Sequence, residues 1–282
     1  HYLKYYGGFS QDGGNNFAVI KIGGGLIQDE LDVLVSSLSF LVDVGLLPVV
    51  IHGAGPQLNA KLSKRGIVSD YHGGIRVTTP EILQVAKQTF QEENFKLLTA
   101  LENRGVRARG FQGGVFTAEL LDFPKFGYVG EVTDVNVALI REQLAQGVVP
   151  VITCMAEATT GQLLNVNADV AAHQLAKTLK PIKIIYLSQA GGLKDDKGTL
   201  LSEIDLATHY DHLMNQEWFT KGNRLKLKEI KTLLDSLPIS SSVSITSAEQ
   251  LPKELFTHKG SGTLVKRSEQ IKSYKNFESI DK

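Results

Sequence analysis

Two glycine-rich turns, each directly behind an apolar strand-like run, constrain this chain more than any other feature. The first run, FAVIKIGGG, ends at Gly25, and the second, LLPVVIHGAGP, ends at Pro56. Each run suits a buried parallel strand, and an amphipathic segment follows it. Glycines at such a junction let backbone N–H groups approach a ligand closely, and the N-terminus of a following helix favours anions. The two loops therefore predict a phosphate group held from both sides.

Strand-like runs alternate with helical patterns along the rest of the chain, which predicts an α/β fold with a mainly parallel sheet. Glycine and proline divide one stretch into short β-rich pieces, which indicates hairpins rather than a helix. We expect helices near 31–44, 80–103, 135–146, 168–179, 206–216 and 225–237, hairpins over 113–132, and late strands over 182–188, 241–246 and 262–267.

The composition excludes several classes of protein. Lysine plus arginine and aspartate plus glutamate number 30 each in 282 residues, so no net charge points to nucleic acid or a membrane surface. No apolar run reaches the roughly 18 residues of a transmembrane helix. The single cysteine, Cys154, excludes an internal disulfide. It ends the apolar run VVPVITC, so we interpret it as a core residue rather than a nucleophile.

The familiar nucleotide-binding motifs do not match. Gly53 and Gly55 begin a GxGxxG pattern, but Leu58 occupies the third glycine position. The Walker A pattern GxxxxGK[ST] does not occur in the sequence. Phosphate binding here requires another geometry.

Two cations stand in unusual contexts. Lys21 lies inside the first apolar run, where it either faces solvent or neutralises an anionic ligand, because burying an unpaired ammonium is costly. Arg76, in GGIRV, is either a surface hairpin residue or a planar clamp for a substrate carboxylate.

The stretch LLNVNADVAA places Asn165, Asn167 and Asp169 where a strand passes into a helix. Asn and Asp favour turns and helix N-caps, which is one interpretation. The other is a polar cluster that orients a substrate and a catalytic lysine. Asp169 has no basic neighbour in the local sequence, so we expect a distant cation as its partner. The later segment KGNRLKLKEIK is cationic, and its spacing does not distinguish Lys226 from lysines on a solvated face.

These motifs, in this order, resemble the amino-acid kinase family, in its acetylglutamate kinase branch. The resemblance covers 17–267 and is closest to bifunctional N-acetylglutamate synthase/kinases and fungal mitochondrial relatives. The matching stretches are KIGGG, HGAGPQLN, GGIRVT, GQLLNVNADVAA, LSQAGGL, KGNRLKLKEIK and FTHKGSGTLV. It implies a three-layer αβα sandwich around a mainly parallel sheet. It also implies transfer of the γ-phosphoryl group of ATP, with Mg²⁺, to the side-chain carboxylate of N-acetyl-L-glutamate in arginine biosynthesis.

The resemblance also implies roles for individual residues. Lys21, Asp169 and Lys226 form the catalytic set, with Asp169 orienting both lysines, and the chain itself supplies no metal ligand. The remaining expected residues are the phosphate-binding Gly23, Gly24, Ala54 and Gly55, the substrate-binding Arg76, Asn165 and Asn167, and the arginine-binding Glu254 and Gly260. For Glu254, an exposed helix glutamate is the alternative.

Other expectations concern the chain as a whole. The resemblance implies feedback inhibition by arginine and a homo-oligomer, without nucleic-acid or membrane partners. We expect an N-terminal segment over 1–16, a kinase domain over 17–267, and a tail over 268–282 that links to an acetyltransferase domain. A bacterial source implies the cytoplasm, and a fungal one the mitochondrial matrix. The rival function is a catalytically silent, arginine-sensing domain of an N-acetylglutamate synthase, although such a domain has no need for all three catalytic residues.

Overall fold

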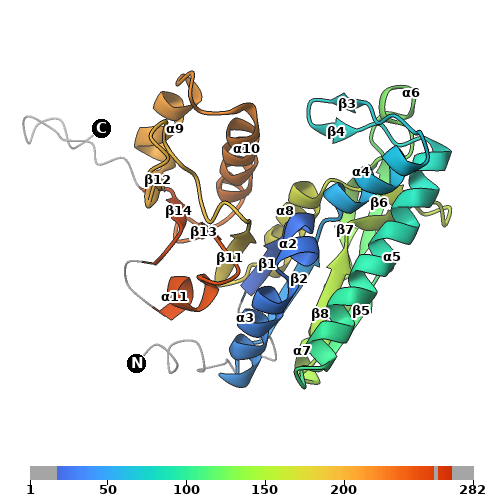
Figure 1. Ribbon diagram of the computed structural model, residues 1–282, viewed down its shortest axis with the longest axis horizontal. Helices are drawn as coiled ribbons and strands as arrows, with labels where there is room; N and C mark the ends of the chain where they lie inside the picture. Colours follow the sequence, from blue (N-terminus) through green and yellow to red (C-terminus); the bar gives the residue numbers. More distant parts are fainter. Residues whose placement is uncertain (1–17, 257–259, 269–282) are drawn as a thin grey trace, which may run out of the picture.

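A central sheet of eight strands organises the computed structural model, which describes residues 18–256 and 260–268 (Figure 1). The strand order is β12-β14-β13-β11-β1-β2-β8-β5, and every neighbouring pair is parallel except β13 and β14. The strands are β1 (Ala18–Ile22), β2 (Pro48–His52), β5 (Ala108–Phe111), β8 (Val149–Thr153), β11 (Lys183–Leu187), β12 (Glu203–Asp205), β13 (Ser242–Thr246) and β14 (Thr263–Lys266).

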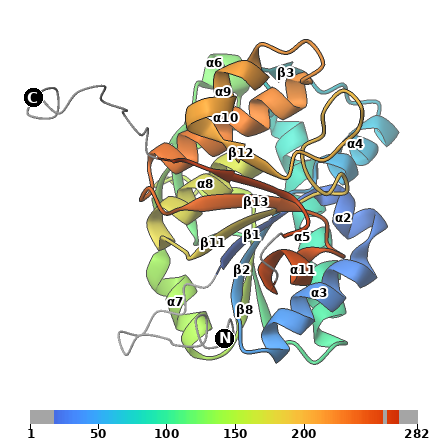
Figure 2. The same cartoon turned by 90° about the vertical axis from the view of Figure 1, so that its left-hand side faces the viewer.

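Helices cover both faces of this sheet, because alternate residues of its buried strands point to opposite sides. In β1, Ile20 packs in one apolar cluster with α3 (Leu31–Asp43), α5 (Pro80–Glu102) and α11 (Leu251–Phe256). Val19 packs in the other, with helices α7 (Val137–Ala145), α8 (Ala168–Leu179), α9 (Leu206–Met214) and α10 (Lys221–Asp235). The predicted three-layer αβα sandwich is confirmed (Figure 2).

Local sequence accounts for most helix boundaries. In α5, the side chain of Thr79 caps the first turn by accepting a hydrogen bond from the N–H of Ile82, and Pro80 occupies the first helical position. α8 begins and ends where the sequence predicts. α10 begins at Lys221, earlier than expected, because Thr220 caps it through the N–H of Asn223. The short helix α11 was not predicted.

Smaller elements stand around the carboxyl ends of the strands. α2 (Gly24–Asp29) follows β1, and α4 (Gly55–Lys64) follows β2. The expected hairpin is present as antiparallel β6 (Phe116–Leu120) and β7 (Gly130–Val135), joined through one helical turn, α6 (Phe123–Phe126). With β9 (Met155–Glu157) and β10 (Leu163–Asn165), these two strands form a second sheet. β3 (Tyr71–His72) and β4 (Ile75–Arg76) form a separate hairpin.

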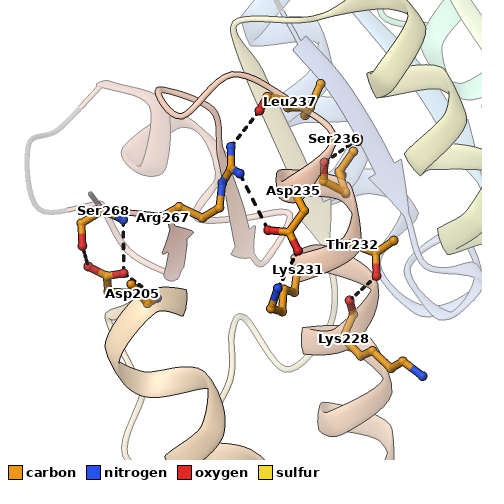
Figure 3. Close-up of polar contacts among 11 residues, drawn as sticks. Asp205, Lys228, Lys231, Thr232, Asp235, Ser236, Leu237, Arg267 and Ser268 are labelled. Carbon is orange, nitrogen blue, oxygen red and sulfur yellow. Dashed lines mark hydrogen bonds and ion pairs between the residues drawn. The ribbon is translucent and has the colours of Figure 1, made fainter. Parts of the chain in front are cut away.

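The last described residues are anchored on α9 and α10 (Figure 3). Arg267 donates to the carbonyl of Leu237 at 2.7 Å and lies 3.7 Å from the carboxylate of Asp235. Ser268 bonds to Asp205, the N-cap of α9, through both its N–H and its hydroxyl. The predicted N-terminal segment 1–16, and all of the predicted tail 268–282 except Ser268, lie outside the described residues. Within the described ranges, no helix is long and apolar enough to cross a membrane.

Candidate active site

The two glycine-rich loops lie side by side. β1 and β2 are parallel neighbours in which Ile22 pairs with His52, so both loops leave the sheet at the same edge. A Cβ on Gly24 would lie 3.0 Å from the Cα of Ala54 and 3.1 Å from the carbonyl oxygen of Gly53. Backbone atoms cannot move aside as easily as a flexible side chain can, so a side chain at position 24 would push the two loops apart by a few tenths of an ångström.

Each loop opens a helix, and the first N–H groups of a helix have no partner within it. α2 starts at Gly24, and α4 starts at Gly55 with Ala54 as its N-cap. These positions match three of the predicted phosphate-binding residues. Gly23 is different, because its N–H donates to the carbonyl of Leu187 at 3.3 Å. Because this N–H already hydrogen-bonds to the neighbouring strand β11, the predicted role of Gly23 as a hydrogen-bond donor to phosphate is not supported.

An ion pair joins β1 to α8 beside the loops. Lys21 shares its side of β1 with Val19, which faces α8, and its Nζ lies 2.8 Å from Oδ1 of Asp169 in the first turn of that helix. The two side chains are only 14% and 26% exposed. The expected distant cation partner of Asp169 is therefore Lys21.

Lys226 joins this pair from α10, which packs on α8. Burial acts to raise the pKa of Asp169, but the ammonium groups of Lys21 and Lys226 outweigh it and hold that pKa below its ordinary value. Burial, with repulsion from Lys21, lowers the pKa of Lys226 against the attraction of Asp169. All three residues of the predicted catalytic set thus act on one another.

A cavity of about 190 Å³ opens beside the second loop. Its wall includes Cys154, which is fully buried as predicted. Burial raises the pKa of the Cys154 thiol to about 12, and the charges of Lys21 and Asp169 act on the same thiol. Ala168, the chain neighbour of Asp169, also lines the cavity. The predicted residues that line the cavity are Ala54, Gly55, Arg76, Asn165 and Asn167.

Arg76 enters this cavity from the β3–β4 hairpin and is only 8% exposed. Its guanidinium donates to the hydroxyl of Ser69 and to Oδ1 of Asn59, and it stacks 4.7 Å from the ring of Tyr71. Burial lowers the Arg76 pKa, although Tyr71 opposes the shift. These hydroxyl and amide partners are uncharged, so the guanidinium can still pair with a carboxylate. Arg76 does lie in a hairpin, but it is buried, so the interpretation of it as a surface residue is wrong.

The sequence offered two interpretations for Asn165 and Asn167, a helix cap and a polar cluster, and the two residues differ in their contacts. Oδ1 of Asn167 caps α8 by accepting hydrogen bonds from the N–H groups of Asp169 (2.8 Å) and Val170 (3.3 Å). This cap orients the first turn of α8, which carries Asp169. Asn165 instead donates to the hydroxyl of Thr78 at 3.1 Å. Both asparagines line the cavity.

The two residues expected to bind arginine lie on the other face of the sheet, where α11 packs against α3. Glu254 is half-buried and accepts hydrogen bonds from the N–H groups of Ser261 (2.7 Å) and Gly262 (3.1 Å). A Cβ on Gly260 would lie 2.5 Å from the Glu254 carboxylate. Glu254 is thus neither exposed nor isolated, since it holds the backbone after α11.

Sequence reasoning missed one neighbour of the charged set. Tyr186 pairs with Lys21 across β11 and β1, and its ring centroid lies 5.7 Å from the lysine Nζ. Burial, with the charges of Asp169 and Glu229, raises the pKa of the Tyr186 hydroxyl. Nothing in the run IKIIYLS distinguishes this tyrosine from an ordinary core residue, because its register with β1 exists only in the sheet.

Comparison with known proteins agrees with this geometry. The sequence model of the amino acid kinase family matches residues 16–242. The chain belongs to the amino acid kinase family. It is 51% identical over 278 residues to an acetylglutamate kinase of Xanthomonas campestris pv. campestris. That match covers 99% of this chain and 65% of the kinase. It is 50% identical over 280 residues to a Schizosaccharomyces pombe protein named as mitochondrial, with 99% and 31% covered. The resemblance to acetylglutamate kinases and fungal mitochondrial proteins is confirmed.

A solved structure shares the fold of this family member. The N-acetylglutamate synthase of Neisseria gonorrhoeae superposes with a TM-score of 0.81 at 22% identity, covering 95% of this chain and 63% of that one. At that identity the likeness concerns the fold alone. The chain spans 65% and 31% of the lengths of the two curated relatives, so the activity of the whole protein is a matter for proposal.

Proposed function

We propose that this chain is an acetylglutamate kinase, which transfers the γ-phosphoryl group of ATP to the side-chain carboxylate of N-acetyl-L-glutamate. The observation that carries the proposal is the convergence of Lys21, Asp169 and Lys226 beside two loops of backbone N–H groups. Phosphoryl transfer requires the reactants to be aligned and the spread negative charge to be neutralised. This arrangement supplies both.

The residues present fit the triphosphate of ATP. The loops touch so closely that a Cβ at Gly24 would meet backbone, which leaves N–H groups without side chains in front of them. The ammonium groups of Lys21, two residues before Gly23, and of Lys226 both interact with Asp169 and supply positive charge to this region. ATP supplies the phosphoryl group, and Mg²⁺ binds largely through phosphate oxygens and water in such sites. Bound this way, Mg²⁺ requires no dedicated cage of protein ligands.

The cavity fits a small dicarboxylate. We propose that Arg76 holds its α-carboxylate, because a planar guanidinium donates two parallel hydrogen bonds to such a group. Asn165, which also lines the cavity, contributes a further polar contact, while Asn167 acts mainly through the first turn of α8. The other carboxylate would then point toward Lys21.

The chain's own groups act by position and charge. The attacking carboxylate is ionised near neutral pH, so no general base is needed. Lys21 and the N–H groups of Gly24, Ala54 and Gly55 stabilise the negative charge of the transferring group, and Lys226 does so on the nucleotide side. Asp169 keeps Lys21 in place through the 2.8 Å contact.

Further parts of the proposal follow from family membership. We propose that arginine inhibits the enzyme through the region of Glu254 and Gly260, that the chain forms a homo-oligomer, and that the kinase domain spans 17–267. Its compartment is the bacterial cytoplasm or, as for the Schizosaccharomyces pombe relative, the mitochondrion. The silent regulatory domain is not favoured, because the Xanthomonas campestris relative at 51% identity is an acetylglutamate kinase and Lys21, Asp169 and Lys226 are all present.

A coupled assay for ADP release with N-acetyl-L-glutamate tests the proposal. We expect turnover with N-acetyl-L-glutamate and much less with L-glutamate or L-aspartate. Lys21→Ala should lower kcat by about 10²-fold or more, since it removes a charge that acts on the transition state. If the wild-type protein binds arginine but releases no ADP, the regulatory domain replaces the kinase as the better interpretation.

A further inference from the structure

Helix α5 holds both glycine-rich loops from outside the site. Lys96 donates to the carbonyl of Ile27 in α2 at 3.0 Å. The amide of Asn94 contacts Nε2 of His52, the last residue of β2, at 3.1 Å and donates to the carbonyl of Val151 at 3.2 Å. Glu93, the neighbour of Asn94, contacts α4 through Gln57. One helix thus contacts α2, which follows the first loop, and the end of β2, which precedes the second loop.

Gln57 is the side chain that connects the two loops directly. It lies in the first turn of α4 and is only 8% exposed. Its Nε2 donates to the carbonyl of Gly24 at 2.7 Å and to Oε2 of Glu93 at 3.0 Å. Because a carbonyl and a carboxylate can only accept, the amide must turn its NH₂ group toward both of them.

The geometry at Gly24 shows how close this contact is. A Cβ on Gly24 would lie 2.8 Å from Oε1 of Gln57, so the glutamine side chain packs over the first residue of α2. Gln57 therefore bonds to the backbone of the first loop while its own backbone belongs to the helix that opens from the second. Its position depends on Glu93, which fixes the amide from the α5 side.

We propose that Gln57 is a positioning residue that sets the spacing between the two glycine-rich loops, with Glu93 as its anchor. At the correct spacing, the N–H groups of Gly24 and Gly55 meet the same phosphoryl group. The inference rests on the proposed function and extends it to residues outside the set that touches the reactants. A displacement of about 1 Å in such a donor can lower a rate by about 10²-fold.

Steady-state kinetics with two variants and a matched control test this inference. Gln57→Met and Glu93→Met remove the polar contacts and keep similar volume. Glu92→Met is the control, because Glu92 is the adjacent carboxylate and its partner is Lys61 on the exposed surface of the same helix pair. We expect Gln57→Met to lower kcat about 10- to 100-fold and Glu93→Met less, with the KM for N-acetyl-L-glutamate within about twofold. That KM is spared because Arg76 lines the cavity, whereas Gln57 and Glu93 do not. A kcat within about twofold of wild type in Gln57→Met would overturn the inference, as would an equal loss in Glu92→Met.

A measurement that needs no turnover separates this inference from the proposed function. In protein labelled with ¹⁵N at glycine, the amide resonances of Gly24 and Gly25 should shift in Gln57→Met and Glu93→Met and stay in place in Glu92→Met. Failure of the wild-type protein to release ADP would then reject the kinase alone. Unchanged Gly24 and Gly25 resonances in Gln57→Met would reject the positioning role of Gln57, whatever the activity.

Discussion

Oδ1 of Asp169 lies 2.8 Å from Nζ of Lys21, although Lys21 comes from the first strand of the sheet and Asp169 from a helix much later in the chain. The contact places a positive charge at the mouth of two amide-lined loops. Lys21 and Lys226 both lower the pKa of Asp169, so both ammonium groups interact favourably with this carboxylate. Removing either partner therefore has consequences for both rate and stability.

Asp169→Asn should lower kcat by about 10²-fold or more, because Lys21 is no longer held in place. It should also lower the free energy of unfolding by about 1–3 kcal/mol, since it leaves a largely buried ammonium without its counter-charge. The Asp169 pKa is depressed on folding, so this stabilisation is complete above the ordinary carboxyl pKa and is lost as the pH falls through the folded-state pKa. Urea unfolding at several pH values measures it. Glu203→Gln, which breaks an exposed ion pair with Lys266, is the control and should change stability little.

Lys226 should limit activity at high pH. Its pKa lies below 10.5, and only the charged form can neutralise the nucleotide side of the reaction. We expect kcat to fall as the pH rises through this lowered pKa. In Lys226→Arg the fall should move to higher pH, because a guanidinium stays protonated. A kcat profile of Lys226→Arg that falls at the same pH as wild type would show that another group titrates.

Arg76→Lys should weaken substrate binding selectively. A lysine retains the charge and loses the planar pair of donors, so we expect the KM for N-acetyl-L-glutamate to rise about 10-fold or more. The KM for ATP should stay within about twofold, because Arg76 lines the cavity and does not belong to the charged set of Lys21, Asp169 and Lys226. Arg65→Lys, at the C-cap arginine of α4 that contacts Gln88 on the exposed surface, is the matched control and should leave both constants unchanged. Equal increases in both KM values would argue against a substrate clamp.

His52 should make stability depend on pH in the weakly acidic range. Burial lowers its pKa from 6.5 to about 4, although the hydrogen bond with Gly53 opposes the shift. Below pH 6.5 the unfolded chain binds a proton at His52 that the folded chain does not, so stability falls with pH down to about 4. The full loss is about 3 kcal/mol, at 1.36 kcal/mol for each pKa unit. In His52→Gln, urea unfolding between pH 7.5 and pH 4.5 should lack this contribution. An unchanged slope would assign the dependence to other groups.

Local sequence predicted much of the fold. The helix over 168–179 has the predicted bounds because its apolar face and its capping asparagine are both visible in a short stretch. The start of α10 and the existence of α11 were missed, because the first depends on a threonine cap five residues upstream of the apolar pattern and the second is only six residues long. Short helices owe their stability to tertiary packing more than to propensity.

For the candidate site, the sequence by itself determined the chemistry that is available: two glycine loops behind parallel strands, a lysine inside a strand, and a polar run before a helix. Only the tertiary structure decided how these groups are used. It placed Lys226 beside Asp169, buried Arg76 in a cavity wall, used Asn167 as a helix cap and returned the amide of Gly23 to the sheet. The physical reason is the separation along the chain over which each effect acts. Backbone propensity and capping depend on a few neighbours, whereas burial and charge pairing depend on which strands and helices meet in space.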